Sequence, residues 1–484
     1  MATGKFQTHA FSIVVALFTV VFLIVFAIFG RYSAETQPLS THDFANVSRN
    51  APLLHDTHAF VLIGFGFLVA FLRRAGFTAL SFNLLILAWV LEWGLIVRGF
   101  MSTEFAQHGY FTISLRDFVK ADYTAAAVLI SFGALVGKLS PIQYVALAII
   151  ETPVQVINEH IVLNYIQAGD VGGSIVVHLF GAVFGLAASR LLFKPSWAVS
   201  EHLGSIYHSD IFSFVGTVFL WAFFPSFNSI FAITAAEQQR SVLNTFLALI
   251  ASTITTFLVS QLVTKDHRFN IKHIASASLA GGVAAGTVST LILAPFPALL
   301  VGVIAGAASV LSFQHLTPAL GKKFNFHDTR GVFSLHGIPA IVGVLASVVL
   351  LFIVPVGPHG EAIRNIYTNF RTDRYQEGYD AAAQALRQLG ALFLTLVIAL
   401  ISGALTGVIL KLSLWAQVRE KEAFADADFF QVTEDYDFTT NVSVHLGASP
   451  ATSSELNSLS MRVERKQLLA NDAAVIPTTV TTTA

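Results

Sequence analysis

Two histidines in this sequence each stand eight residues after an aspartate, inside runs of small and apolar residues: His178 follows Asp170, and His336 follows Asp328. At roughly 1.5 Å per residue, each ring lies about 12 Å from its aspartate along a helix. An imidazole changes charge near neutral pH, and its two nitrogens can donate and accept hydrogen bonds. The rest of the chain has to explain two titratable rings at matching depth in apolar helices.

A histidine in an apolar helix also has a plain structural interpretation, as a satisfied polar residue that bridges two helices. Ionisable residues within membrane spans are costly, however, and usually mark pathways for ions or protons. The equal spacing in two distant segments favours a functional pair, His178 and His336. The sequence has no HExxH motif and no cluster of HxxxH motifs, so we expect no metal, no cofactor and no enzyme activity.

The two aspartates also have structural interpretations. Asp170 precedes Val171-Gly172-Gly173-Ser174 and is placed to cap a helix by accepting from its first N–H groups. Asp328 has several basic residues near it, which predicts an exposed ion pair of little energetic value. The basic residues are Lys322, Lys323 and Arg330.

Most of the 43 phenylalanines are expected to face lipid or to pack between helices. Tyr123, which follows Asp122, and Phe227 lie where an aromatic ring has a functional use. Phe227 follows Pro225, and this proline is predicted to break its helix. Freed backbone is tolerated at membrane depth only where protein or a water-filled cavity satisfies it. Aromatic faces beside such a cavity attract small cations.

The composition indicates a membrane protein. Of 484 residues, 54% are hydrophobic and 12% are charged, against roughly 25% charged residues in soluble domains. Mean hydropathy is +0.68. The net charge of −1 predicts no nucleic-acid partner, and the absence of cysteine excludes disulfides and thiolate sites.

We predict about twelve transmembrane helices, because runs near 20 apolar residues suffice to cross a bilayer. Phe11–Gly30 is predicted to be a retained helix rather than a cleaved signal. The other expected spans are His58–Leu72, Leu80–Val97, Ala121–Val136, Gln143–Ile161, Gly172–Leu192, Ile211–Phe227, Ser241–Val263, Ile274–Leu293, Ala298–Phe313, Phe333–Val354 and Leu389–Leu412.

Basic residues in alternate loops predict that both termini are cytoplasmic. The opposite loops hold Asn46, in the sequon Asn46-Val47-Ser48, which is the expected glycosylation site. The composition shifts after Trp415. We therefore expect a membrane domain over residues 1–415 and a cytoplasmic tail over 416–484 whose distal part is disordered.

The glycine-rich segments Leu279–Thr287 and Gly64–Phe67 lack the lysine of a phosphate loop and the third glycine of a dinucleotide site. Close helix packing explains them better.

Several long segments, in the right order, resemble the Rh (Rhesus) glycoproteins of the ammonium transporter superfamily, from the first helix to about Phe430. The segments are His58–Asn83, Gly137-Lys138-Leu139-Ser140-Pro141-Ile142-Gln143, Asn158-Glu159, Asp170–Gly185, Gly216–Ser229, Leu279–Thr287 and Leu335-His336-Gly337-Ile338-Pro339.

The resemblance implies an all-α membrane fold with an inverted repeat, one pore per subunit and a homotrimer in the plasma membrane. In that family the histidines matching His178 and His336 face each other in an apolar pore, supported by the position of Asp170. Two stacked phenylalanines gate its outer mouth, at the positions of Tyr123 and Phe227. Tyr123 departs from that pattern, because a tyrosine stands where the family has a phenylalanine. Arg330 and Phe333, shortly before the second histidine, also differ from the common Rh pattern.

The expected function is therefore a channel that gathers ammonium outside, in part through Asp122, and conducts ammonia, with carbon dioxide as a second candidate passenger. Two alternatives stay open. One is a structural Rh-type protein without transport, although such relatives typically lack pore histidines. The other is an electrogenic ammonium transporter in which the same rings relay a proton.

Overall fold

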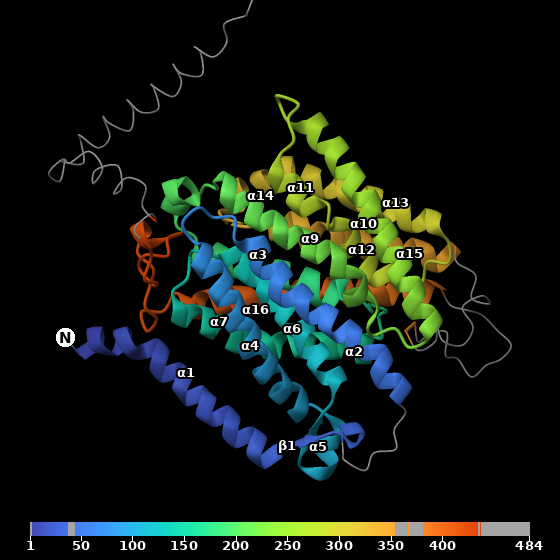
Figure 1. Cartoon of the computed structure of the whole chain (residues 1–484), viewed down its shortest axis with the longest axis horizontal. Coiled ribbons are helices and arrows are strands. Elements are labelled where there is room, and N and C mark those ends of the chain that lie inside the picture. The colour runs from blue at the N-terminus through green and yellow to red at the C-terminus, as the bar shows by residue number, and fades with distance from the viewer. Residues whose placement is uncertain (1, 37–43, 354–365, 368–380, 434–435, 437–484) are drawn as a thin grey trace, which may run out of the picture. The chain divides into compact units, whose positions relative to one another are not determined.

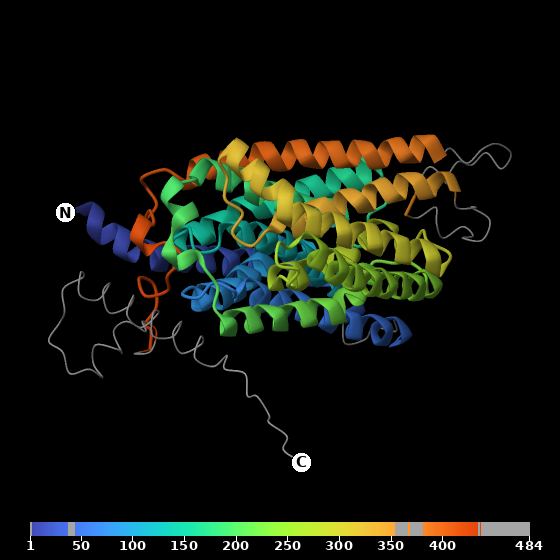
Figure 2. The same ribbon diagram turned by 90° about the horizontal axis from the view of Figure 1, so that it is seen from above.

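In the part of the chain that the structure describes, eleven helical segments are long and apolar enough to cross a membrane. The structure, a computed structural model, describes residues 2–36, 44–353, 366–367, 381–433 and 436, without the side chains of 2–8 and 44–50. Met1–Phe429 form one compact unit, and most of its helices run side by side (Figures 1 and 2). The spans are His9–Phe29, Ala51–Val69, Gly76–Phe100, Leu115–Leu135, Pro141–Ile166, Ser174–Leu192, Tyr207–Ser229, Ala235–Val263, Pro295–Phe324, Phe333–Ile353 and Ala381–Leu410.

The spans are built mainly from α-helices, several of which contain or adjoin a turn of π-helix. The α-helices are α1 (Ala2–Phe29), α2 (Phe44–Ala59), α3 (Gly66–Val69), α4 (Gly76–Phe100), α5 (Thr103–His108), α6 (Leu115–Leu135), α7 (Pro141–His160), α8 (Phe180–Leu192), α9 (Tyr207–Ser229), α10 (Ala235–Val263), α11 (Ile271–Ala277), α12 (Ala280–Val288), α13 (Pro295–Leu311), α14 (Thr317–Phe324), α15 (Ile338–Ile353) and α16 (Ala381–Leu410).

The shorter elements are of three kinds. The π-helical turns are η2 (Phe60–Phe65), η3 (Ile161–Ile166), η4 (Ser174–Leu179), η7 (Ser312–Leu316) and η8 (Phe333–Gly337). The 3-10 turns are η1 (Ala34–Thr36), η5 (Pro195–Val199), η6 (Glu201–Leu203) and η12 (Glu420–Glu422). Strands β1 (Gly30–Tyr32) and β2 (Phe111–Ile113) pair in parallel, with Arg31 opposite Thr112.

The predicted span Ile274–Leu293 is not one helix. It divides into α11 and α12, which are separated by Ser278 and Leu279 and are each too short to cross a bilayer. Discontinuous helices of this kind commonly line transporter pathways. In Figure 2, α1 begins on the side of the bundle where α16 ends.

The glycines of α12 allow backbones to approach, which confirms the packing interpretation. A Cβ on Gly281 would lie 2.1 Å from the Ala248 oxygen, and one on Gly286 would lie 2.9 Å from the Gly172 oxygen. The Gly172 N–H donates to the Gly286 oxygen at 2.8 Å. These contacts fix α12 against α10 and against the chain just before η4.

The predicted helix break at Pro225 is wrong, because α9 continues through this proline to Ser229. A proline removes one backbone hydrogen bond, and membrane helices tolerate this when neighbouring groups replace it. The continuous helix carries Phe224 and Phe227 into the interior, where both rings are buried.

Two expectations from the sequence are not tested by these residues. Asn46 lies near the start of α2, in a stretch whose side chains are not described. Most of the predicted tail, 437–484, lies outside the described residues.

Candidate functional site

Asp170 caps the π-helical turn that carries His178. Its Oδ2 accepts from the N–H groups of Ile175 and Val176 at 2.9 and 3.0 Å, and its Oδ1 accepts from the Thr287 hydroxyl at 2.9 Å. The capping contacts considered from the sequence are therefore present, and a second bond reaches α12. Gly173 at the start of the turn has φ +70°.

Asp328 caps the second histidine segment in the same way. Its Oδ1 accepts from the N–H groups of Gly331 and Val332, both at 2.9 Å, and its Oδ2 accepts from Phe333 at 3.0 Å. The prediction of an exposed ion pair is wrong: the carboxylate is half-buried and accepts from backbone donors. Capping groups are favoured here because the first N–H groups of a helix lack intrahelical partners.

Burial raises the pKa of both carboxyl groups. Burial raises the pKa of Asp170 to about 6, against the opposing effect of hydrogen bonds from Val176 and Thr287. Burial also raises the pKa of Asp328, opposed by its backbone hydrogen bonds and by the charge of Lys138. Desolvation penalises the charged form, whereas donors aimed at the carboxylate favour it.

The two predicted histidines meet in the interior. Their Nδ1 atoms are 3.1 Å apart, and the ring planes are parallel within 5°, with centroids separated by 5.1 Å. His178 is 0% and His336 is 4% exposed. A contact between two Nδ1 atoms requires one to carry the proton and the other its lone pair. Two imidazolium rings would aim two N–H groups at each other, so the geometry fits at most one charged ring.

Aromatic rings lie beside both histidines and mark the two ends of a path through the pair. His178 lies beside Phe227 at a centroid distance of 6.0 Å. His336 stacks on Phe65 at 5.9 Å and 13°. We call the Phe227 side the outer end of the path and the Phe65 side its inner end.

Tyr123 and Phe227 close the outer end. Their rings stack at a centroid distance of 4.1 Å and an angle of 10°, and both are at least 96% buried. The Tyr123 hydroxyl donates to the backbone oxygen of Phe227 and lies 3.4 Å from that of Val171. On its other side Phe227 stacks on Phe60 at 4.7 Å. The hydroxyl that departs from the family pattern therefore ties the two gate residues together.

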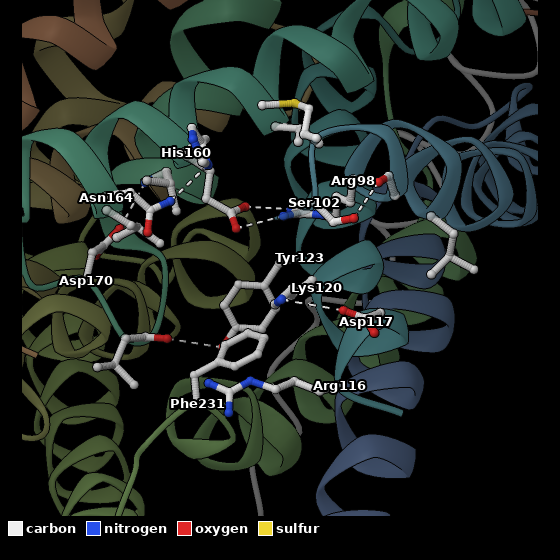
Figure 3. A pocket seen from close by; sticks show the side chains of 18 of the residues that line it. Arg98, Ser102, Arg116, Asp117, Lys120, Tyr123, His160, Asn164, Asp170 and Phe231 are labelled. Atoms are coloured by element: carbon white, nitrogen blue, oxygen red, sulfur yellow. Dashed lines mark hydrogen bonds and ion pairs between the residues drawn. The ribbon is translucent and has the colours of Figure 1, made fainter. Parts of the chain in front are cut away.

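Outside this gate lies a cavity of about 520 Å³, which we call the vestibule (Figure 3). Tyr123 and Asp170 contribute to its wall, and the Phe231 ring meets Tyr123 edge-on at 4.8 Å. Lysine and arginine contribute three side chains to the lining, Arg98, Arg116 and Lys120, and aspartate and glutamate contribute four, Glu104, Asp117, Glu159 and Asp170.

Asp122 is not in the vestibule, contrary to the sequence-based expectation. Its carboxylate is 1% exposed and lies 3.0 Å from Nδ1 of His58. Adjacent residues of a helix point in different directions, so the lining position of Tyr123 turns Asp122 toward α2.

Sequence reasoning missed several residues of the site. Glu159 lines the vestibule and forms a bidentate pair with Arg98, at 2.6 and 2.9 Å. Phe60, Phe65 and Phe231 complete the aromatic walls. Glu159 carried a signal, as an acid near the end of a span beside Asn158. The phenylalanines carried none, because this residue type is abundant throughout the chain.

Comparison with known proteins places this geometry in context. The model of the Ammonium Transporter Family matches residues 14–432. The chain is 38% identical over 421 residues to "Ammonium transporter Rh type B" of Papio hamadryas, covering 86% of this chain and 91% of that protein. The human protein of the same description is also 38% identical over 421 residues, with the same coverage.

Solved structures agree. That of Nitrosomonas europaea Rh50, described as one of the Rhesus protein family of channels, has a TM-score of 0.70 and 29% identity, and the match covers 89% of this chain and 100% of that one. Mep2 of Saccharomyces cerevisiae has a TM-score of 0.62 at 19% identity, covering 84% and 91% respectively. The latter similarity is one of fold.

Proposed function

Because this chain belongs to the Ammonium Transporter Family, we propose that it conducts neutral ammonia through the path lined by His178 and His336. The activity of the chain is transport of ammonia or ammonium, which its family and its Rh type B relatives support. The observation that carries the finer proposal is the contact of the two buried, parallel imidazoles through Nδ1 atoms 3.1 Å apart.

The vestibule is suited to gathering ammonium. The Tyr123 and Phe231 rings offer π-faces, and the carboxylate of Asp170 contributes negative charge, whereas the charge of Glu159 is balanced by Arg98. Arg116 already lies over the Phe231 ring at 5.6 Å, so this ring attracts a cation in the resting structure. Aromatic attraction of this kind is worth about 0.5–2 kcal/mol, which concentrates ammonium weakly and lets it leave.

The path beyond the gate selects against charge. A bare ammonium ion between buried rings loses its hydration, at a cost that a neutral amine avoids. Ammonium must therefore lose its proton before the passage of ammonia beyond Tyr123 and Phe227. In the pore, the neutral imidazole pair offers ammonia one acceptor or one donor at a time.

Reconstituted liposomes test this proposal, with internal pH followed after an inward ammonium gradient. Wild-type protein is expected to alkalinise the lumen faster than empty liposomes, and His178→Ala and His336→Ala to change that rate. His273→Ala is the matched control. This imidazole is also buried, but its hydrogen bond is to Ser260 of α10, at 3.1 Å. Wild-type rates equal to those of empty liposomes, together with no effect of either pore substitution, would refute the proposal.

The electrogenic alternative uses the same histidines as a proton relay. Current recorded across the same membranes distinguishes the two schemes, since neutral ammonia carries none. A current that scales with the flux in wild-type protein would replace the neutral mechanism by the relay.

We further propose a homotrimer in the plasma membrane with cytoplasmic termini and carbon dioxide as a second passenger. The loop charges support the orientation, and the family resemblance supports the assembly. Carbon dioxide is small and uncharged, as the apolar path requires. Acidification of the same liposomes after a carbon dioxide jump, compared between wild type and His178→Ala, tests that passenger.

A further inference from the structure

Arg330 holds a buried positive charge among neutral partners. The side chain is 5% exposed. Its Nε donates to the Leu68 oxygen at 2.8 Å, and its terminal nitrogens donate to the hydroxyls of Ser276 and Ser213 at 3.0 and 3.4 Å. Within the described part of the chain, no carboxylate lies within ion-pairing distance of it. A buried charge without an ionic partner is costly and is retained where it serves a purpose.

The guanidinium lies toward the inner end of the path. Arg330 precedes His336 by six residues, across the positive-φ turn at Gly331 and the π-helical turn η8. Its acceptor Leu68 follows Phe65, the ring stacked on His336, by one helical turn. The Tyr123–Phe227 gate and the vestibule are at the opposite end, beside His178. The cation is thus positioned after the histidines on the route of an entering solute.

The neighbouring charges leave an excess of positive charge. Lys138 is buried and donates to the neutral oxygens of Ala134, Ser189 and His327. Asp328 is the half-buried acid beside Arg330 and Lys138. Burial lowers the pKa of Lys138 to about 7, so the three side chains together carry a net charge between 0 and +1 at neutral pH. Lys272 and Asp210 lie nearer solvent, where their fields are screened. Burial lowers the pKa of Arg330 to about 10, so the guanidinium stays charged at neutral pH.

We propose that Arg330 determines the selectivity of the pore for the neutral species, because its buried charge repels ammonium in the inner half of the path. This inference rests on the proposed function, since it presumes that ammonia is the passenger. A fixed arginine that excludes cations by its field is an established device of selective pores. The repulsion does not act on ammonia, which has no net charge.

The expected size of the effect follows from Coulomb's law. For a separation on the order of 10 Å and an effective dielectric constant of about 20, the repulsion lowers occupancy by a cation on the order of tenfold. Removal of the charge should therefore raise the ratio of current to ammonia flux by about tenfold, with the flux itself changed less.

The test uses full-length protein in liposomes, with internal pH and electrical current measured on the same preparation. Arg330→Gln removes the charge, and Arg330→Lys retains it with fewer donors. Ser276→Asp leaves the guanidinium in place and neutralises it from 3.0 Å away. Arg190→Gln is the matched control, since this arginine is exposed at the end of α8.

We expect Arg330→Gln and Ser276→Asp to raise the ratio of current to flux, and Arg330→Lys and Arg190→Gln to leave it near the wild-type value. Equal ratios in wild type, Arg330→Gln and Ser276→Asp would overturn the inference while the proposed function stands. An increase shared equally by Arg330→Lys would overturn it too, because geometry and not charge would then be responsible. If Arg330→Gln does not fold, Ser276→Asp decides alone. Wild-type protein without flux would instead refute the proposed function.

Discussion

The segments Asp170–His178 and Asp328–His336 share one local design and differ in their surroundings. In each, the aspartate caps a π-helical turn, a glycine three residues later has positive φ, and the histidine follows after eight. The first segment faces the vestibule and a hydroxyl of α12. The second lies against buried cations. The two segments therefore have the same backbone geometry, whereas the charges around them differ.

Substitution of the positive-φ glycine in each segment should disturb this shared design most strongly. Gly331→Ala places a Cβ 2.2 Å from the Phe313 ring at φ +82°, whereas Gly173→Ala meets a Val177 methyl at 2.7 Å at φ +70°. We expect both to destabilise, Gly331→Ala by about 3 kcal/mol and Gly173→Ala by about 2 kcal/mol. Thermal unfolding in detergent measures this. Gly76→Ala, with open space around its Cβ, is the control, and equal melting temperatures for all would contradict the prediction.

Neutral caps test whether both aspartates act through charge. Asp170→Asn and Asp328→Asn keep an acceptor oxygen but lose the charge that strengthens their bonds to N–H donors, at a cost of about 1–2 kcal/mol each. We expect flux to fall by about tenfold in Asp170→Asn, because this residue also lines the vestibule, and less in Asp328→Asn. Flux in liposomes measures both, and a larger loss in Asp328→Asn would reverse the comparison.

A change of external pH tests the difference between the outer and inner ends of the path. The pKa of Asp170 is raised to about 6 by burial, so the carboxylate is charged above this pH and becomes neutral below it. Flux normalised to ammonia concentration should fall severalfold as external pH drops through 6. The Asp170→Asn protein should show no such step, since it has no proton to gain. A step that persists in Asp170→Asn would assign the titration to another group.

The gate covers the first segment alone, and Tyr123→Phe tests what its hydroxyl adds. The substitution removes the hydrogen bond to the Phe227 oxygen while the stacked rings remain. A bond of this kind contributes about 1 kcal/mol, so we expect flux to rise about two- to threefold. Stopped-flow pH traces would detect this. An unchanged or lower flux would show that ring stacking sets the gate.

Much of the architecture was predictable from the sequence, because its signals are local. Apolar run length predicted the spans, and His178 and His336 were identified by their shared spacing. The capping geometry of Asp170 followed from its place before a helix. The same reasoning failed for Asp328, because neighbours in sequence predicted an ion pair and the fold supplied backbone N–H groups instead. It failed for Pro225, because the loss of one hydrogen bond did not outweigh the rest of α9.

Composition, spacing and capping thus determined by themselves that this is a membrane protein with two equivalent histidine segments. Only the tertiary structure decided that the two Nδ1 atoms meet, 158 residues apart in sequence. It also turned Asp122 from the vestibule to His58, and it buried Arg330 with no carboxylate of the described residues in ion-pairing distance. Helical periodicity sets which residues share a face, but the partner of each face depends on close packing at sites such as Gly281 and Gly286. That packing joins segments whose separation in sequence carries no record of their distance in space.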